Sequence, residues 1–341
     1  MPIHPFDSIR GRIETFTIES KALAGNMLGD PSKRSVSVYL PPNYEADTDT
    51  PLLVDLVGFT GSGFAHTNWK PFAESVPQRH ERLVKEEKMG PCVIAFPDCF
   101  TSLGGNQYID SSAMGDWASF LTDEMLPELE ERYGTKPGRD GRGVFGKSSG
   151  GYGAIMHGLR YAQHWGAVAC HSGDMGFDRL FLGDFPKILN RLDAEGGIES
   201  FFEKLDSADK VSGDDFHVLL VLAMAATYDP CAESFKGIRL PVDMHTCELD
   251  ADRWQAWMNH DPVTLVDQAE CQNALRSLKG IYIDCGSKDQ YNIHYGSRQF
   301  CKTLDSLGIG HRYDEFDDTH SNVDYRMDES LPFLYDALTK S

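Results

Sequence analysis

Two kinds of hydrophobic pattern alternate along the chain. Short, nearly continuous apolar runs are typical of parallel strands buried on both faces. Between them, apolar residues recur at helical spacing. This alternation predicts an α/β fold with an open, mostly parallel central sheet and helices on both of its faces. Buried strands are expected at 52–57, 92–96, 141–145, 167–170 and 281–285, and helices at about 71–88, 116–133, 151–164, 295–307 and 331–340.

Two further segments have alternating apolar and polar residues, as expected for strands at the edges of a sheet. The first, at 35–40, is expected to be antiparallel and ends at Pro41. The second covers 311–316.

Residues 177–262 break this rhythm, because they contain helical segments and no clear strand. An insertion above the carboxyl edge of the sheet, where α/β folds bind ligands, would explain the pattern. A long connection packed beside the sheet is the alternative. Since no repeat or linker marks a boundary, we expect one domain over 1–341 with a cap at 177–262.

Composition excludes several classes of partner. The chain has 52 acidic and 32 Lys or Arg residues, giving a net charge of -20. Such a charge repels nucleic acid and anionic lipid, so neither is expected as a partner.

No apolar run is long enough to span a membrane, and the sequence from Met1 to Asp7 has no secretory signal pattern. The eight cysteines form no C-x-x-C pair, which favours buried thiols in the reducing cytoplasm.

The segment Gly146-Lys147-Ser148-Ser149-Gly150 fits the G-x-S-x-G pattern of a nucleophile elbow. In such an elbow the central serine lies on a tight turn between a strand and a helix. A plain serine-glycine turn would have the same letters. The expected strand before this segment and the expected helix after it favour Ser148 as a nucleophile.

An acid and then a histidine should follow such a serine, each in a loop after a strand. Asp289 is expected as the acid, since its rival Asp284 lies inside the strand. His320 is expected as the base. Its rivals are less suitable, because His311 begins a strand and His294 begins a helix.

The oxyanion of an acyl-transfer intermediate needs N–H donors that are already in position. The backbone N–H of Ser149, the residue after the nucleophile, is expected to be one donor. The other is expected from the glycine-rich loop at 58–63, with Phe59 as the first choice and Thr60 as the alternative.

These motifs resemble the "Putative esterase" family of α/β-hydrolases, which includes esterase D, feruloyl esterases and enterochelin esterase-like proteins. The resemblance covers most of the chain and includes the elbow, Cys285-Gly286-Ser287-Lys288-Asp289 and Thr319-His320-Ser321. The family usually has His-Gly before its oxyanion loop, whereas this chain has Val57 in place of that histidine. The resemblance implies an α/β-hydrolase fold and a serine esterase that uses no cofactor.

We therefore expect hydrolysis of a small carboxylic ester or thioester through an acyl-enzyme on Ser148. Acyl transfer on the same fold, a serine peptidase and a non-catalytic binding protein are the alternatives. No metal site is expected, and a homo-oligomer is left open. The residues expected to contact substrate are Asn106, Tyr108, His171, Trp254 and Trp257, although the two tryptophans could equally anchor the packing of the cap.

Overall fold

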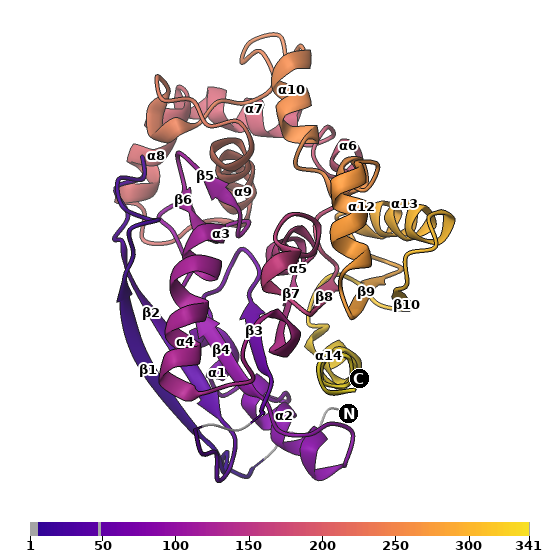
Figure 1. Ribbon diagram of the computed structural model, residues 1–341. Coiled ribbons are helices and arrows are strands. Elements are labelled where there is room, and N and C mark those ends of the chain that lie inside the picture. Colours follow the sequence, from indigo (N-terminus) through magenta and orange to yellow (C-terminus); the bar gives the residue numbers. More distant parts are fainter. Residues whose placement is uncertain (1–5, 47–48, 341) are drawn as a thin grey trace.

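A computed structural model describes residues 6–46 and 49–340. Within this part of the chain, helices cover both faces of an eight-stranded sheet (Figure 1). Residues 1–5, which carry most of the segment judged for a secretory signal, lie outside it. In spatial order the strands are β1 (Arg12–Glu19), β2 (Lys33–Leu40), β4 (Val93–Pro97), β3 (Leu52–Leu56), β7 (Arg142–Lys147), β8 (Ala167–His171), β9 (Gly280–Gly286) and β10 (Arg312–Phe316).

The sheet is mostly parallel, which confirms the prediction. Strand β2 runs antiparallel to both of its neighbours, β1 and β4, and the other neighbouring strands are parallel. The expectation that residues 35–40 form an edge strand is wrong, because β1 covers that side of β2. Strand β1 has mostly exposed side chains, and only Phe16 and Ile18 are partly buried against the core, so its hydrophobic signal is weak.

Successive residues of the central strands point to opposite faces of the sheet, and both faces are buried. Leu53 and Phe145 belong to one hydrophobic cluster, whereas Val54 and Val144 belong to the other. This double burial explains the continuous apolar runs in the sequence. The first face is covered by α2 (Val76–Lys85) and α14 (Met327–Thr339), and the second by α4 (Leu126–Tyr133), α5 (Ser149–Arg160), α12 (Ala269–Arg276) and α13 (Ile293–Ser306).

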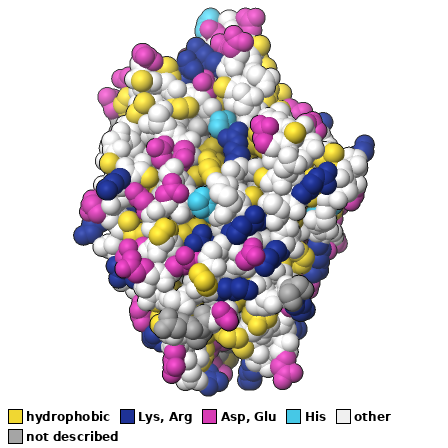
Figure 2. Space-filling model, viewed as in Figure 1, with side chains coloured by type: hydrophobic (Ala, Val, Ile, Leu, Met, Phe, Trp, Pro, Cys, Tyr) yellow, Lys and Arg dark blue, Asp and Glu magenta, His cyan; other side chains and the backbone are white. Residues whose placement is uncertain are grey.

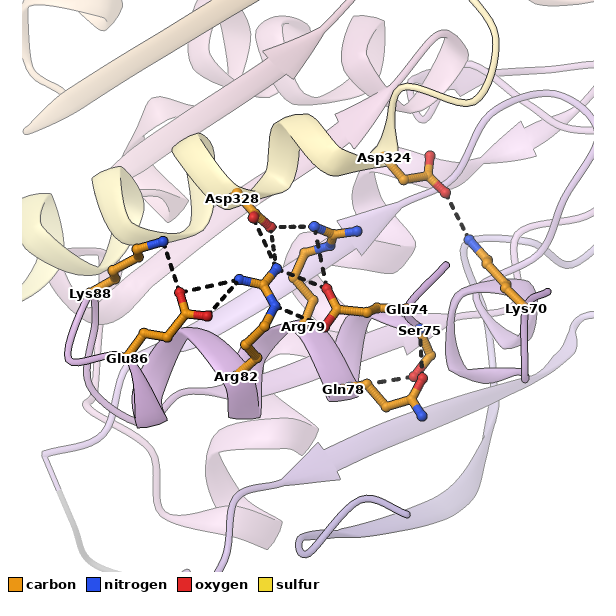
Figure 3. Close-up of polar contacts among 10 residues, drawn as sticks. All are labelled: Lys70, Glu74, Ser75, Gln78, Arg79, Arg82, Glu86, Lys88, Asp324 and Asp328. Carbon is orange, nitrogen blue, oxygen red and sulfur yellow. Dashed lines mark hydrogen bonds and ion pairs between the residues drawn. The ribbon is translucent and has the colours of Figure 1, made fainter. Parts of the chain in front are cut away.

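Helix α2 begins later than the sequence pattern indicates. The Ser75 hydroxyl accepts from the backbone N–H of Gln78, and the Gln78 side chain accepts from the backbone N–H of Ser75. This capping box starts the helix and leaves residues 68–74 outside it. Figure 3 shows Arg82 of α2 between Glu74 and Asp328, with N–O distances of 2.8 and 2.7 Å. The pair with Asp328 ties α2 to α14, whereas Glu74 lies in the loop just before α2.

The segment 177–262 is helical, as predicted. Its central helix is almost entirely buried and apolar on most sides, which is typical of a helix enclosed by others. Figure 1 shows its outer helices as a layer at the top of the view, far from both chain ends. The helices are α6 (Phe177–Leu180), α7 (Phe185–Glu195), α8 (Ile198–Ser207), the central α9 (Gly213–Tyr228), α10 (Ala251–Met258) and α11 (Pro262–Leu265).

The eight cysteines are free thiols, and six of them are buried. Burial raises the pKa of thiols such as Cys92 and Cys170, which keeps them in the unreactive neutral form. Among the described residues, no helix is both long enough and apolar enough to cross a bilayer.

Candidate active site

Ser148 lies at a strained turn between a strand and a helix. Strand β7 ends at Lys147 and α5 begins at Ser149. Ser148 itself has φ 57° and ψ -124°, a conformation that L-residues rarely adopt. Its backbone N–H donates to the carbonyl of His171 at 2.9 Å, and its own carbonyl accepts from Tyr152 N–H at 2.8 Å. The surrounding structure therefore holds the strained conformation in place.

The elbow glycines are required by close packing. A Cβ atom at Gly150 would collide with the backbone of Leu56 and Val57 on the neighbouring strand. One at Gly146 would collide with Leu56 and with Gly150. The two glycines thus allow the turn to lie directly against β3.

His320 and Asp289 form a buried pair. The Nδ1 atom of His320 lies 2.8 Å from Oδ2 of Asp289. The other oxygen of Asp289 accepts from the backbone N–H of Tyr291 at 2.8 Å, and the Tyr291 ring lies edge-on to the imidazole. Each partner lies in a loop that follows a strand, β10 for His320 and β9 for Asp289. This arrangement fixes the orientation of the imidazole.

The rival acid and bases lie in other environments. Asp284 is buried and accepts from His171, Tyr282 and Arg326, so it belongs to a structural network. The Nδ1 atom of His311, which directly precedes β10, donates to the backbone carbonyl of Ile309 at 3.0 Å. His294 is buried in the first turn of α13.

Ser148 and His320 line one cavity of about 420 Å³. Phe59 and Thr60 of the loop after β3 line it as well. That loop is anchored by a hydrogen bond of 2.7 Å from Gly105 N–H to the carbonyl of Phe59. Ser149 is the first residue of α5, where backbone N–H groups have no partner inside the helix. Both expected oxyanion donors therefore lie on segments next to Ser148.

One wall of the cavity comes from the inserted segment. Its apolar side chains are Leu180, Phe181, Phe216 and Leu220. Side chains from residues 177–262 thus line the same cavity as Ser148.

The side chain of Gln107, which the sequence did not single out, contacts Ser149 and Asp174 beside the proposed nucleophile. The amide of Gln107 donates to the hydroxyl of Ser149 and to Oδ2 of Asp174, each at 3.2 Å. Asp174 follows β8 and lines the cavity, and burial raises its pKa to about 6. No pattern around Gln107 distinguishes it from any polar loop residue.

Two of the expected substrate contacts, Asn106 and Tyr108, instead bond to the protein itself, Asn106 within its own loop and Tyr108 to the segment after β3. Asn106 donates to the carbonyl of Cys99 and accepts from Tyr108 N–H at 2.6 Å. The hydroxyl of Tyr108 donates to the carbonyl of Val57 at 2.6 Å. Neither residue is among the described residues that line the cavity, so the expectation of direct contact is corrected for both.

His171, Trp254 and Trp257 are also outside the cavity lining within the described chain. His171 is buried between Asp284 and Ser330, with both contacts at 2.8 Å. Trp257 is fully buried and packs on Trp254 and on Phe181, whose side chain does line the cavity. The tryptophans are therefore packing anchors behind the wall.

Within residues 6–46 and 49–340, no group of three or more His, Cys, Asp or Glu side chains is arranged to hold a metal ion. The cavity lining instead contains basic side chains that the sequence did not indicate. They are His66, Lys70 and Lys147.

Comparison with solved structures shows the fold. A ferulic acid esterase superposes with a TM-score of 0.62 at 18% identity, covering 97% of this chain and 100% of the other. S-formylglutathione hydrolase from Agrobacterium tumefaciens gives 0.57 at 16% identity, covering 97% of each. These likenesses establish the α/β-hydrolase fold.

Esterase Rv1288 of Mycobacterium tuberculosis is 34% identical over 97 residues, which are 27% of this chain. The alignment spans only 20% of that relative's length. The model of the esterase family described as "Putative esterase" matches residues 29–328, most of the chain. The chain therefore belongs to this esterase family.

Proposed function

We propose that the enzyme cleaves a small carboxylic ester or thioester through an acyl-enzyme on Ser148. One observation carries the proposal: the strained Ser148 shares a cavity with His320, whose other ring nitrogen is held by buried Asp289. A serine hydroxyl is a weak nucleophile near neutral pH and needs an adjacent base.

In this mechanism His320 takes the proton from Ser148 as the hydroxyl attacks the carbonyl carbon. Asp289 holds the imidazole in the required tautomer and stabilises the imidazolium that forms. His320 then gives the proton to the leaving alcohol or thiol. Water then attacks the carbonyl of the acyl-enzyme while His320 takes the proton from the water. His320 returns this proton to the Ser148 oxygen as the acid is released.

The negative oxygen of each tetrahedral intermediate would be stabilised by the backbone N–H groups of Phe59 and Ser149. Loss of one such donor typically costs about 3–4 kcal/mol in the activation barrier. Residues 177–262 would act as a cap that closes over the acyl or leaving group. The free cysteines also support our proposal of a cytoplasmic location.

The test is hydrolysis of 4-nitrophenyl butyrate by two adjacent variants. Ser148→Ala should lose activity by about 10⁴-fold or more, because the nucleophile is gone. Ser149→Ala keeps its backbone N–H and should retain measurable hydrolysis. Loss of activity in Ser149→Ala with retention in Ser148→Ala would contradict the assignment.

A further inference from the structure

The cavity beside Ser148 is lined by basic side chains as well as by the carboxylates of Asp174 and Asp324. The chain carries a net charge of -20, and acidic side chains are spread over the face shown in Figure 2. Within the cavity, Lys147, Lys70 and His66 form a group of basic side chains, which we name the cationic wall. Lys147 directly precedes the proposed nucleophile along β7.

Two members of the cationic wall have acidic partners. Lys70 Nζ lies 2.8 Å from Oδ2 of Asp324, as Figure 3 shows. Nδ1 of His66 lies 2.6 Å from Oδ2 of Asp55, whose carboxylate is fully buried in β3. These pairs hold both basic groups in place at the cavity.

Lys147 differs from them. In the described part of the chain, no hydrogen bond or ion pair is formed by its ammonium group. Burial lowers the pKa of the Lys147 ammonium group, and the charge of Lys70 lowers it further. The carboxylates of Asp324 and Asp289 act in the opposite direction and raise this pKa. The charged ammonium is thus incompletely compensated, and a bound anion would compensate it.

The apolar wall could not take such an anion. Leu180, Phe181, Phe216 and Leu220 offer no charged or hydrogen-bonding side chain. The cavity therefore separates an apolar region under the inserted segment from a charged region next to Ser148. A substrate that fills both regions would have an apolar part and an anionic part.

We propose that the cationic wall binds an anionic group, a carboxylate or a phosphate, on the ester substrate, with Lys147 as its main contact. The proposal rests on the proposed esterase function. It assigns Lys147 a role in selecting substrate, which the position x of a G-x-S-x-G motif does not by itself imply.

The experiment compares kcat/KM for matched anionic and neutral esters after subtraction of the uncatalysed rate. For an anion on the acyl side, the pair is mono-4-nitrophenyl glutarate and 4-nitrophenyl valerate. For an anion on the leaving group, the pair is 3-carboxyphenyl butyrate and 3-carbamoylphenyl butyrate. Within each pair, the neutral ester reports any general loss of folding or chemistry, so the ratio isolates recognition of charge.

Lys147→Gln should lower the anionic-to-neutral ratio about tenfold on one of the two arms, the size expected for loss of one charge-assisted contact. Lys147→Arg should retain most of the ratio, and added NaCl should lower it in the wild type. The control is Lys302→Gln, which removes an exposed lysine of α13 outside the cavity and should leave the ratio unchanged.

The arm that responds identifies the side of the ester that carries the anion. An unchanged ratio on both arms in Lys147→Gln, or an equal fall in Lys302→Gln, would overturn the proposal while leaving the esterase function intact. Failure of the wild type to hydrolyse any of the four esters would overturn the proposed function and this proposal with it.

Discussion

Nδ1 of His320 lies 2.8 Å from Oδ2 of Asp289, and the carboxylate has no exposed side-chain surface. In chain order the two residues follow Ser148, which lines the same cavity as His320. The two aspartates are only five positions apart but have different partners. Asp289 pairs with His320, whereas Asp284 pairs with His171.

Asp289→Asn tests whether Asp289 is the carboxylate that supports His320. The amide keeps the size of the side chain but cannot hold the imidazole in the required tautomer, so kcat should fall about 10³–10⁴-fold. Circular dichroism and the melting temperature should change little. An unchanged kcat would remove Asp289 from the mechanism.

Asp284→Asn is the matched comparison. Asp284 accepts from His171, Tyr282 and Arg326 in a buried network. Breaking such a network should cost about 3–5 kcal/mol in the free energy of unfolding. Urea denaturation measures this cost, and a larger loss of kcat than in Asp289→Asn would reverse the two roles.

Asp174 should make stability depend on pH. Burial raises its pKa in the folded state to about 6, above the ordinary value of 3.8. The folded state therefore binds the proton more tightly than the unfolded state, and this site's contribution to stability falls as pH rises from about 4 to 6. Above pH 6 the penalty is constant, at about 3 kcal/mol as an upper value.

Asp174→Asn removes that titration and can still accept from Gln107. The gain in the free energy of unfolding over the wild type should therefore be larger at pH 7.5 than at pH 4. Urea denaturation at both pH values gives the comparison. A gain that is larger at pH 4 would show that the folded state does not raise the pKa of Asp174.

Trp257 should contribute to the stability of the fold rather than to catalysis. Its side chain is fully buried among aromatic rings, and it supports Phe181 at the cavity wall. Trp257→Ala should lose about 3–5 kcal/mol of unfolding free energy, as other large-to-small core substitutions do. Trp254→Ala should lose less, because Trp254 is only partly buried. Equal losses would contradict the packing described for the cap.

Gly150→Ala should destabilise the elbow, since the added Cβ would meet the backbone of β3. A loss of about 1–3 kcal/mol or more is expected from such overpacking. Gly183→Ala is the control, because nothing lies within 4 Å of a Cβ at that position. Equal melting temperatures for the two variants would argue against the close approach of the elbow to β3.

The sequence was sufficient for the buried strands and for placing Asp289 and His320 in loops after strands, because hydrophobic runs and turn glycines report backbone geometry locally. It was insufficient for β1, where most side chains are exposed and only Phe16 and Ile18 are partly buried. It also misplaced Asn106 and Tyr108, since the side chain of Asn106 donates to the backbone carbonyl of Cys99 and that of Tyr108 to the backbone carbonyl of Val57. Lys70 and Lys147 meet only through folding, so no local pattern could indicate the cationic wall.

The most direct test of the central claim is peptide mass spectrometry after labelling with a fluorophosphonate. The account predicts a single adduct on Ser148, absent in Ser148→Ala and formed far more slowly in Asp289→Asn. An adduct on Ser149 or on another residue, or full labelling of Ser148→Ala, would contradict it.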